Sequence, residues 1–375
     1  MSSKEVQRWA DEFMFEAEEI NEDTGPEVYL LAGNPDPLGS IAAAAKAYVG
    51  EFVGSLAEIT DSERRHYLTE IQKTALAMPL EAVQFHFRIK GVTRGFTHQM
   101  VRQRTAAYSQ ESTRFAVKSG VPVGRPPSLE GTLSREEWRK SEEDRLAKDG
   151  LFVTDGLGFQ EDSERAWSEW EERYATDAQK WRFKWDEQVA SIAKFYNEVV
   201  DAGMPAEDAR GILPTNLLTQ LNYITNLRNL QVEGGKRLCT QAQFEWRIVW
   251  AKMVEAIRKF GETQTYRAPV TADELGDGGG WDFDQRVGDL TTRDSSWQYE
   301  ELAKIFKPVC YLEGSCPFNA SFDRKCSIRG RVEANAAANR PSSEWDQPFH
   351  GLVGEPLKIE PIHPAEWLMD PAAAR

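Results

Sequence analysis

The chain has 375 residues, of which 41% are hydrophobic, and a formal net charge of −15 at neutral pH. This length and apolar content allow one large core or two smaller ones. The acidic balance argues against a general nucleic-acid backbone binder, because neutralising phosphates requires a basic face. No apolar run approaches the roughly 20 residues that span a bilayer, and the first residues lack the apolar stretch of a signal peptide. Four cysteines in a chain of this length suit a reducing compartment better than a disulfide framework. We therefore expect a soluble, cytoplasmic protein with no nucleic-acid or membrane partner.

The first predicted elements are helices and one strand. Residues 41–75 combine Ala-rich and mixed apolar and polar runs, which are typical of two helices. Residues 83–89 alternate apolar and polar side chains, which predicts a strand with one apolar and one polar face. After Gly91 the apolar residues take a helical spacing through Met100.

The later elements are predicted to be mainly helical. Residues 120–132 are rich in Pro and Gly and should form a loop. Residues 135–201 are charged and Trp-rich, with helical spacing that favours packed helices over a base-stacking platform. A further helical stretch is expected from Pro205 towards Met253, with a break at the proline of Leu213-Pro214. Residues 274–284 indicate a flexible connection to a C-terminal extension, whose last residues are expected to be partly disordered.

Two segments contain arginines in settings that favour an anionic ligand. Residues 94–115 hold Arg94, Arg102, Arg104 and Arg114 among Ser, Thr and Gln side chains. The planar guanidinium binds phosphate or carboxylate through paired hydrogen bonds, although solvated surface arginines would also explain this segment alone. In residues 209–247, Arg210, Arg228 and Arg237 stand among apolar residues, where a charge requires a partner.

Together the two segments resemble the flavin-dependent thymidylate synthase family (ThyX). Its signature is Arg-His-Arg, seven residues, Ser, and then Arg-Tyr. This chain has Arg102-Gln103-Arg104, seven residues, Ser112, and then Arg114-Phe115. The family's distal pattern is matched at Ala209-Arg210, Leu213-Pro214, Asn226-x-Arg228, Arg237 and Ala242-Gln243. The resemblance covers residues 76–255.

The resemblance implies an α+β fold, with an antiparallel sheet flanked by helices and additional helical segments, assembled as a homotetramer whose active sites lie between subunits. We expect an N-terminal helical region at residues 1–75, a catalytic domain including the Trp-rich segment at 76–270, and the C-terminal extension at 271–375. The residues implied to bind FAD are Arg102, Gln103, Arg104, Asn226, Arg228 and Gln241. Those implied to bind the nucleotide are Gln99, Gln110, Ser112, Arg114, Arg210 and Arg237.

In the family, reduced flavin relays a one-carbon unit from methylenetetrahydrofolate to C5 of dUMP, and NADPH reduces the flavin. No enzyme nucleophile is required, so Ser112 is expected to contribute to catalysis by binding near the nucleotide phosphate with Arg114. Arg237 is implied to polarise the pyrimidine carbonyl and to stabilise the charge that develops on the ring.

Several positions depart from the family pattern. The signature His is Gln103, the usual Asn-Glu is Ser109-Gln110, the final Tyr is Phe115, and a distal His is Gln241. Glutamine keeps a donor and an acceptor but cannot change charge near neutral pH. Three functions therefore stay open: methylation of dUMP, hydroxymethylation or methylation of another pyrimidine nucleotide such as dCMP, and a non-catalytic nucleotide- or flavin-binding homologue.

The cysteines of the C-terminal extension suggest one metal hypothesis. Cys310, Cys316 and Cys326 have the spacing C-x5-C-x9-C, and His350 or His363 would complete a tetrahedral zinc site. This spacing is not that of common zinc modules. We expect no metal and treat the three cysteines as reduced thiols.

Overall fold

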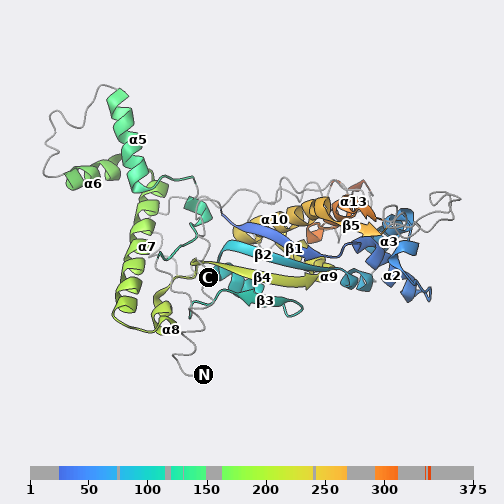
Figure 1. Ribbon diagram of the computed structural model, residues 1–375. Helices are drawn as coiled ribbons and strands as arrows, with labels where there is room; N and C mark the ends of the chain where they lie inside the picture. Colours follow the sequence, from blue (N-terminus) through green and yellow to red (C-terminus); the bar gives the residue numbers. More distant parts are fainter. Residues whose placement is uncertain are drawn as a thin grey trace. The chain divides into compact units, whose positions relative to one another are not determined.

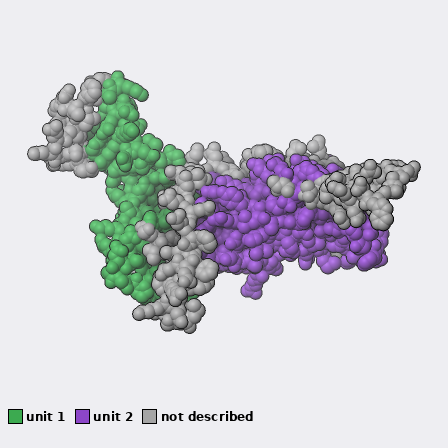
Figure 2. Space-filling view, viewed as in Figure 1, with its two compact units in different colours: residues 1–17, 112–217, 355–375 green, residues 18–111, 218–354 purple. Residues whose placement is uncertain are grey.

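The computed structural model describes residues 25–73, 77–114, 120–129, 131–148, 163–239, 242–267, 292–310, 334, 337 and 338. These residues form two compact units (Figure 2). The first unit comprises the described residues of 112–217, and the second comprises those of 18–111 and 218–354. The three domains expected from the sequence stay a prediction.

The second unit contains the sheet and most of the core. Its strands are β1 (Glu27–Gly33), β2 (Gln84–Thr93), β3 (Ala107–Gln110), β4 (Leu218–Asn226), β5 (Thr265–Arg267) and β6 (Thr292–Asp294). Its α-helices are α2 (Pro37–Tyr48), α3 (Asp61–Lys73), α4 (Arg94–Met100), α9 (Leu227–Arg237), α10 (Phe244–Phe260) and α13 (Ser296–Ala303). Short 3₁₀ helices are η1 (Leu56–Glu58), η2 (Met78–Ala82) and η5 (Gly261–Thr263).

A four-stranded sheet in the order β1-β2-β4-β3 is antiparallel throughout. Phe87 of β2 pairs with Tyr223 of β4, and Ile89 pairs with Leu221. These four side chains are buried, because residues two apart on a strand face the same side of the sheet. The predicted antiparallel sheet of an α+β fold is therefore present.

Helix α10 covers the apolar face of this sheet (Figure 1). Its buried side chains recur at helical spacing, and Trp246, Trp250 and Met253 are each at most 1% exposed. They join the strand residues in one hydrophobic cluster. This cluster fixes the position of both ends of α10 relative to the strands, and those ends matter for the candidate site.

Two strands differ from the predictions made from the sequence. Residues 218–226 were expected to be helical and form β4, because β4 pairs with both β2 and β3 and buries Thr219, Leu221, Tyr223 and Thr225 on alternate positions. The region 1–75, expected to be helical, contains β1, which pairs with β2. Its two predicted helices are present as α2 and α3.

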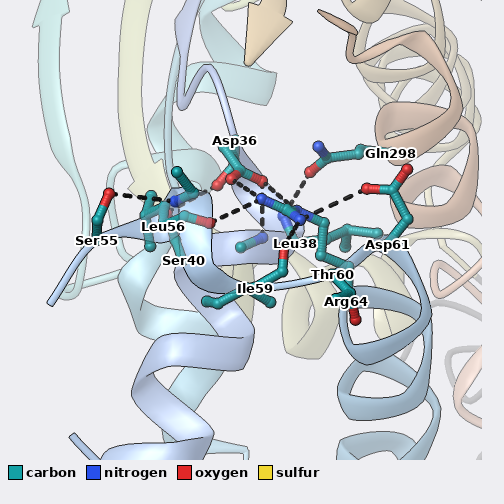
Figure 3. Close-up of polar contacts among 12 residues, drawn as sticks. Asp36, Leu38, Ser40, Ser55, Leu56, Ile59, Thr60, Asp61, Arg64 and Gln298 are labelled. Carbon is teal, nitrogen blue, oxygen red and sulfur yellow. Dashed lines mark hydrogen bonds and ion pairs between the residues drawn. The ribbon is translucent and has the colours of Figure 1, made fainter. Parts of the chain in front are cut away.

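A buried ion pair holds the start of α2 to α3 (Figure 3). Arg64 is fully buried, and its Nε lies 3.0 Å from Asp36 Oδ1 while its NH2 pairs with Oδ2 at 2.5 Å. The Asp36 carboxylate also accepts the backbone N–H of Gly39 at 2.8 Å, which caps α2. Gln298 of α13 reaches the same corner, where its Oε1 accepts the N–H of Leu38 at 2.9 Å.

The part of the C-terminal extension from Ser295 to Cys310 belongs to the core of the second unit. Tyr299, Leu302 and Phe306 are at most 1% exposed and join the main hydrophobic cluster. A Cβ at Gly33 would lie 2.6 Å from the Tyr299 hydroxyl, so only glycine lets β1 approach α13 this closely. The expected flexible connection at 274–284 lies outside the described residues.

We expect Tyr299→Phe to lower the free energy of unfolding by about 1–2 kcal/mol, because a half-buried carbonyl loses its donor. The Tyr299 hydroxyl donates to Asn34 O at 2.6 Å, and the Asn34 side chain bonds the backbone at Ala82 and Gln84. Urea unfolding measures the change. Tyr48→Phe is the matched control, since Tyr48 is 57% exposed and should change stability by less than about 0.5 kcal/mol. Equal stability of Tyr299→Phe and the unaltered chain would show that this hydroxyl contributes nothing.

The first unit is mainly helical. Its elements are η3 (Pro127–Leu129), α5 (Arg135–Lys148), α6 (Ser163–Tyr174), α7 (Asp177–Asp201), α8 (Ala206–Ala209) and η4 (Arg210–Ile212). Trp138, Trp167 and Phe183 form a hydrophobic cluster against which Trp170 packs. The prediction of packed helices in the Trp-rich segment is thus confirmed for these residues. No helix in the described ranges is long and apolar enough to cross a membrane.

Candidate active site

The junction between β2 and α4 is fixed to the start of α10. Thr93 caps α4, and its N–H and hydroxyl donate to the two oxygens of Glu245 at 2.6 Å and 2.7 Å. Burial raises the pKa of Glu245, although the two Thr93 bonds oppose this. These contacts place the N-terminus of α4 beside the first turn of α10.

Gln99 lies where α4 meets that turn. Its Oε1 accepts the indole N–H of Trp246 at 3.0 Å, and its Nε2 donates to Gln243 Oε1 at 3.1 Å. The Gln99 side chain is exposed despite both bonds. Trp246 therefore sets the orientation of the Gln99 amide, since an indole N–H can only donate.

Arg237, the last residue of α9, lies over the same tryptophan. The guanidinium carbon is 4.1 Å from the centroid of the Trp246 ring. Glu233, one turn earlier, has its Oε2 3.9 Å from Arg237 Nε, and this buried Nε makes no hydrogen bond within the part of the chain that the structure describes. Burial lowers the pKa of Arg237, and Glu233 opposes the shift. Arg237 and Gln99 therefore both contact Trp246.

Gln103 is half-buried and is held by both ends of its amide. Nε2 donates to Glu233 Oε2 at 3.1 Å, and Oε1 accepts the hydroxyl of Tyr223 at 2.9 Å. Tyr108 also donates to the backbone oxygen of Gln103 at 3.2 Å. Burial, and to a smaller extent the charge of Glu233, raises the pKa of both tyrosines, so they are hydrogen-bond donors at neutral pH.

The two signature arginines lie on either side of Gln103 and are exposed. Neither the Arg102 nor the Arg104 side chain forms an ion pair or hydrogen bond with another described residue. Gln110, at the end of β3, donates to Thr97 Oγ1 at 2.9 Å. Arg102 and Arg104 are thus available to an anion, whereas one Gln110 donor is already used.

Two other expected cofactor positions already have protein partners. The Asn226 side chain caps α9 by accepting the N–H of Asn229 at 2.9 Å. Arg228 forms an ion pair with Glu81 of η2, and both side chains are more than 40% exposed. Gln241 and Phe115 lie outside the described residues.

Three expected site residues belong to the first unit. Ser112 Oγ accepts the backbone N–H of Arg114 at 3.3 Å, and Arg114 is exposed. Arg210 is exposed as well, and its Nε donates to Glu207 O at 3.0 Å. The Ser112 hydroxyl therefore supports the local turn that presents Arg114.

Sequence patterns did not indicate Glu233, Trp246 or Glu81 as parts of the site. Each acts through a contact between two elements, with Trp246 under Arg237 and Glu81 beside Arg228. The one available signal was spacing, since Glu233 and Arg237 lie four residues apart on one helix face.

No group of three or more metal-ligating side chains occurs among the described residues. Cys310 is 7% exposed and belongs to the main hydrophobic cluster. Cys316, Cys326, His350 and His363 fall outside the described ranges, so the zinc hypothesis is not tested.

The fold is α+β, and the ends of α4 and α9 bring Gln99 and Arg237 to the ring of Trp246. A family model described as "Thymidylate synthase complementing protein" matches residues 29–260. The chain belongs to this family. The match ends before α13, so the helix that packs against α10 lies beyond it.

Several relatives are named flavin-dependent thymidylate synthases. The one from Geobacter sulfurreducens is 28% identical over 239 residues, which cover 63% of this chain and 84% of the relative. The one from Pyrococcus furiosus is 29% identical over 234 residues, covering 62% and 79%.

Solved structures with a similar arrangement include ThyX from Helicobacter pylori complexed with FAD and dUMP. It has 18% sequence identity and a TM-score of 0.39, over 61% of this chain and 93% of that one. The UMP/dUMP methylase PolB from Streptomyces cacaoi, bound with 5-Br dUMP, has 16% identity and a TM-score of 0.42, over 62% and 90%.

Proposed function

We propose that this chain is a flavin-dependent enzyme that transfers a one-carbon unit from methylenetetrahydrofolate to C5 of dUMP, with NADPH as reductant. Membership of the family and the names of the relatives support this reaction class. The observation in the structure that supports it best is Arg237, whose partly buried guanidinium lies on Trp246 with an Nε that makes no hydrogen bond within the described residues.

The residues present fit FAD in part. Arg102 and Arg104 are exposed, and their side chains bond no other residue in the described ranges, as suits donors to a pyrophosphate. FAD, when bound, supplies the transfer of the carbon unit and of hydride. Asn226 and Arg228 would contact FAD while also keeping their present protein partners. Gln103 would not contact FAD directly and would act through Arg102 and Arg104 on either side of it.

The chain's own residues would bind and polarise the nucleotide. Arg237 would face the pyrimidine carbonyl and stabilise negative charge developing on the ring. Gln99 would lie beside it, and Gln110 would complete the contacts to the base. Ser112, Arg114 and Arg210 would hold the phosphate end, where a fixed charge is required rather than a nucleophile.

A cytosine nucleotide is a second candidate substrate. The Gln99–Gln243 amide pair near Arg237 offers both donors and acceptors, so it could bind a 4-amino group as well as a 4-oxo group. Methylation or hydroxymethylation of dCMP is therefore the alternative reaction.

We also propose a cytoplasmic homotetramer in which Ser112 and Arg237 of different subunits serve one site. The assembly would bring the phosphate-binding and base-binding residues together. Co-expressed Ser112→Ala and Arg237→Ala chains should then regain turnover in mixed tetramers, because some sites contain both intact residues. Mixed tetramers that stay at the activity of the parents would exclude the shared site.

Arg114→Ala should weaken dUMP binding by about 10- to 100-fold, because a charge-assisted phosphate contact contributes about 1.5–3 kcal/mol. FAD affinity should change little. Isothermal titration with each ligand measures both effects. Arg104→Ala is the matched variant, an equally exposed arginine for which the loss should fall mainly on FAD. Equal loss of both ligands in Arg114→Ala would point to a structural defect instead.

The direct test of the proposed ligands uses the purified chain. It should carry a flavin absorption spectrum, and addition of dUMP should perturb that spectrum with saturation. A chain that takes up no FAD and binds neither dUMP nor dCMP would contradict the proposal.

A further inference from the structure

Among the described carboxylates, only Glu233 contacts both Arg237 and Gln103, the residue between the two signature arginines. Its Oε2 accepts Gln103 Nε2 at 3.1 Å and lies 3.9 Å from Arg237 Nε. Its other oxygen pairs with Lys236 at 2.8 Å on the exposed side of α9. The Glu233 side chain is only 18% exposed, so its interactions with Gln103 and Arg237 are partly shielded from water.

The carboxylate determines which way the Gln103 amide points. An ionised carboxylate can only accept hydrogen bonds, so the amide nitrogen must face Glu233 and the amide oxygen must face Tyr223. With both ends used, Gln103 serves as a link between the loop of Arg102 and Arg104 and the helix α9.

The same carboxylate restrains Arg237. A guanidinium stacked on an indole ring can still rotate in the plane above it. The charge of Glu233 on the Nε side opposes that rotation. A restrained donor costs less entropy when a ligand binds.

We propose that Glu233 is a positioning residue, which couples the loop of Arg102 and Arg104 to Arg237 and holds the Arg237 guanidinium ready for the pyrimidine. This inference rests on the proposed function. It gives Gln103 a role different from a direct cofactor contact: the glutamine at the signature His position transmits the position of α9 to the two neighbouring arginines.

The test compares Glu233→Gln and Glu233→Ala with Lys236→Ala. Glu233→Gln retains an oxygen for Gln103 and loses the charge opposite Arg237, so dUMP affinity of the FAD-free protein should fall about 10-fold in calorimetry. Glu233→Ala loses both contacts, and kcat/KM should fall by roughly 10- to 100-fold, the scale of a small misplacement in a site. Lys236→Ala removes the exposed contact of the same carboxylate and should match the unaltered chain within about twofold.

Two further readouts separate positioning from a general structural role. The thermal unfolding midpoint and FAD affinity of Glu233→Gln should stay close to those of the unaltered chain. The exchange variant Q103E/E233Q keeps one carboxylate and one amide at the contact but moves the charge off α9. It should fold normally and bind dUMP as weakly as Glu233→Gln.

Three outcomes would overturn the inference. Glu233 variants that bind dUMP and turn over like Lys236→Ala would show that Glu233 positions nothing. Losses of dUMP affinity that appear only together with lower unfolding midpoints and lower FAD affinity would assign Glu233 a structural role. An unaltered chain that binds neither dUMP nor dCMP would remove the proposed function and this inference together. Equal dUMP binding by the unaltered chain and the Glu233 variants would remove the inference alone.

Discussion

Arg237→Ala is expected to lower kcat/KM for dUMP by about 100- to 1,000-fold, the usual loss when one well-placed donor to a developing charge is removed. The guanidinium lies over Trp246, and in the proposed function it binds the pyrimidine carbonyl. The side chain is 26% exposed at the end of α9, so its removal should leave the fold intact. Steady-state kinetics with saturating FAD measures the change.

Two variants serve as controls for Arg237. Arg237→Lys keeps the charge but loses the planar fork and should recover only part of the activity. Arg258→Ala removes an arginine that is 48% exposed on α10, paired with Glu255, and should leave kcat/KM unchanged. Activity of Arg237→Ala within a few-fold of the unaltered chain would show that Arg237 does not act on the base.

Asp36→Ala should lower the free energy of unfolding by about 3–5 kcal/mol, because it leaves the buried charge of Arg64 without its partner. Arg64 is fully buried and bound by Asp36 through two nitrogens, and the backbone oxygen of Leu56 accepts its NH2 at 3.0 Å (Figure 3). The same substitution removes the cap of α2 at Gly39. Denaturant unfolding measures the loss.

The matched control removes the other carboxylate that contacts Arg64. Asp61 lies 3.5 Å from Arg64 NH1 and is 37% exposed, so Asp61→Ala should cost less than about 1 kcal/mol. If Asp36→Ala is as stable as Asp61→Ala, then the backbone oxygens alone satisfy Arg64, and the ion pair does not hold α2 to α3.

The strands illustrate what hydrophobic periodicity can predict. Residues 83–89 alternate strictly, and the strand predicted there is present as β2, although β2 continues to Thr93, where a helical spacing was expected. Leu217, just before β4, and Leu221 and Ile224 within it also fit a helical spacing of three and four residues, which is consistent with the helix wrongly predicted there. Pairing with β2 and β3 on both sides decides the structure, and a single segment does not show its partners.

The candidate site also contains residues that the sequence predicts and contacts that it does not show. The arginines were found because their spacing follows a family signature, and the structure brings Arg237 and Gln99 together at Trp246. The contact of Gln103 with Glu233 joins residues 130 positions apart, and no local pattern marks it. The substitution of the signature His by Gln103 was visible in the sequence, but its internal hydrogen bonds were not.

The most direct test of the proposed function follows a labelled carbon. The purified, FAD-loaded chain is incubated with dUMP, NADPH and methylenetetrahydrofolate that carries ¹³C in its methylene group, and the nucleotide is analysed by mass spectrometry. A parallel reaction contains dCMP, and the Arg237→Ala variant serves as the inactive control. The account predicts a dUMP product that carries a labelled methyl group on C5, formed by the unaltered chain and strongly reduced in the variant. A flavin-loaded chain that transfers no labelled carbon to either nucleotide would contradict it.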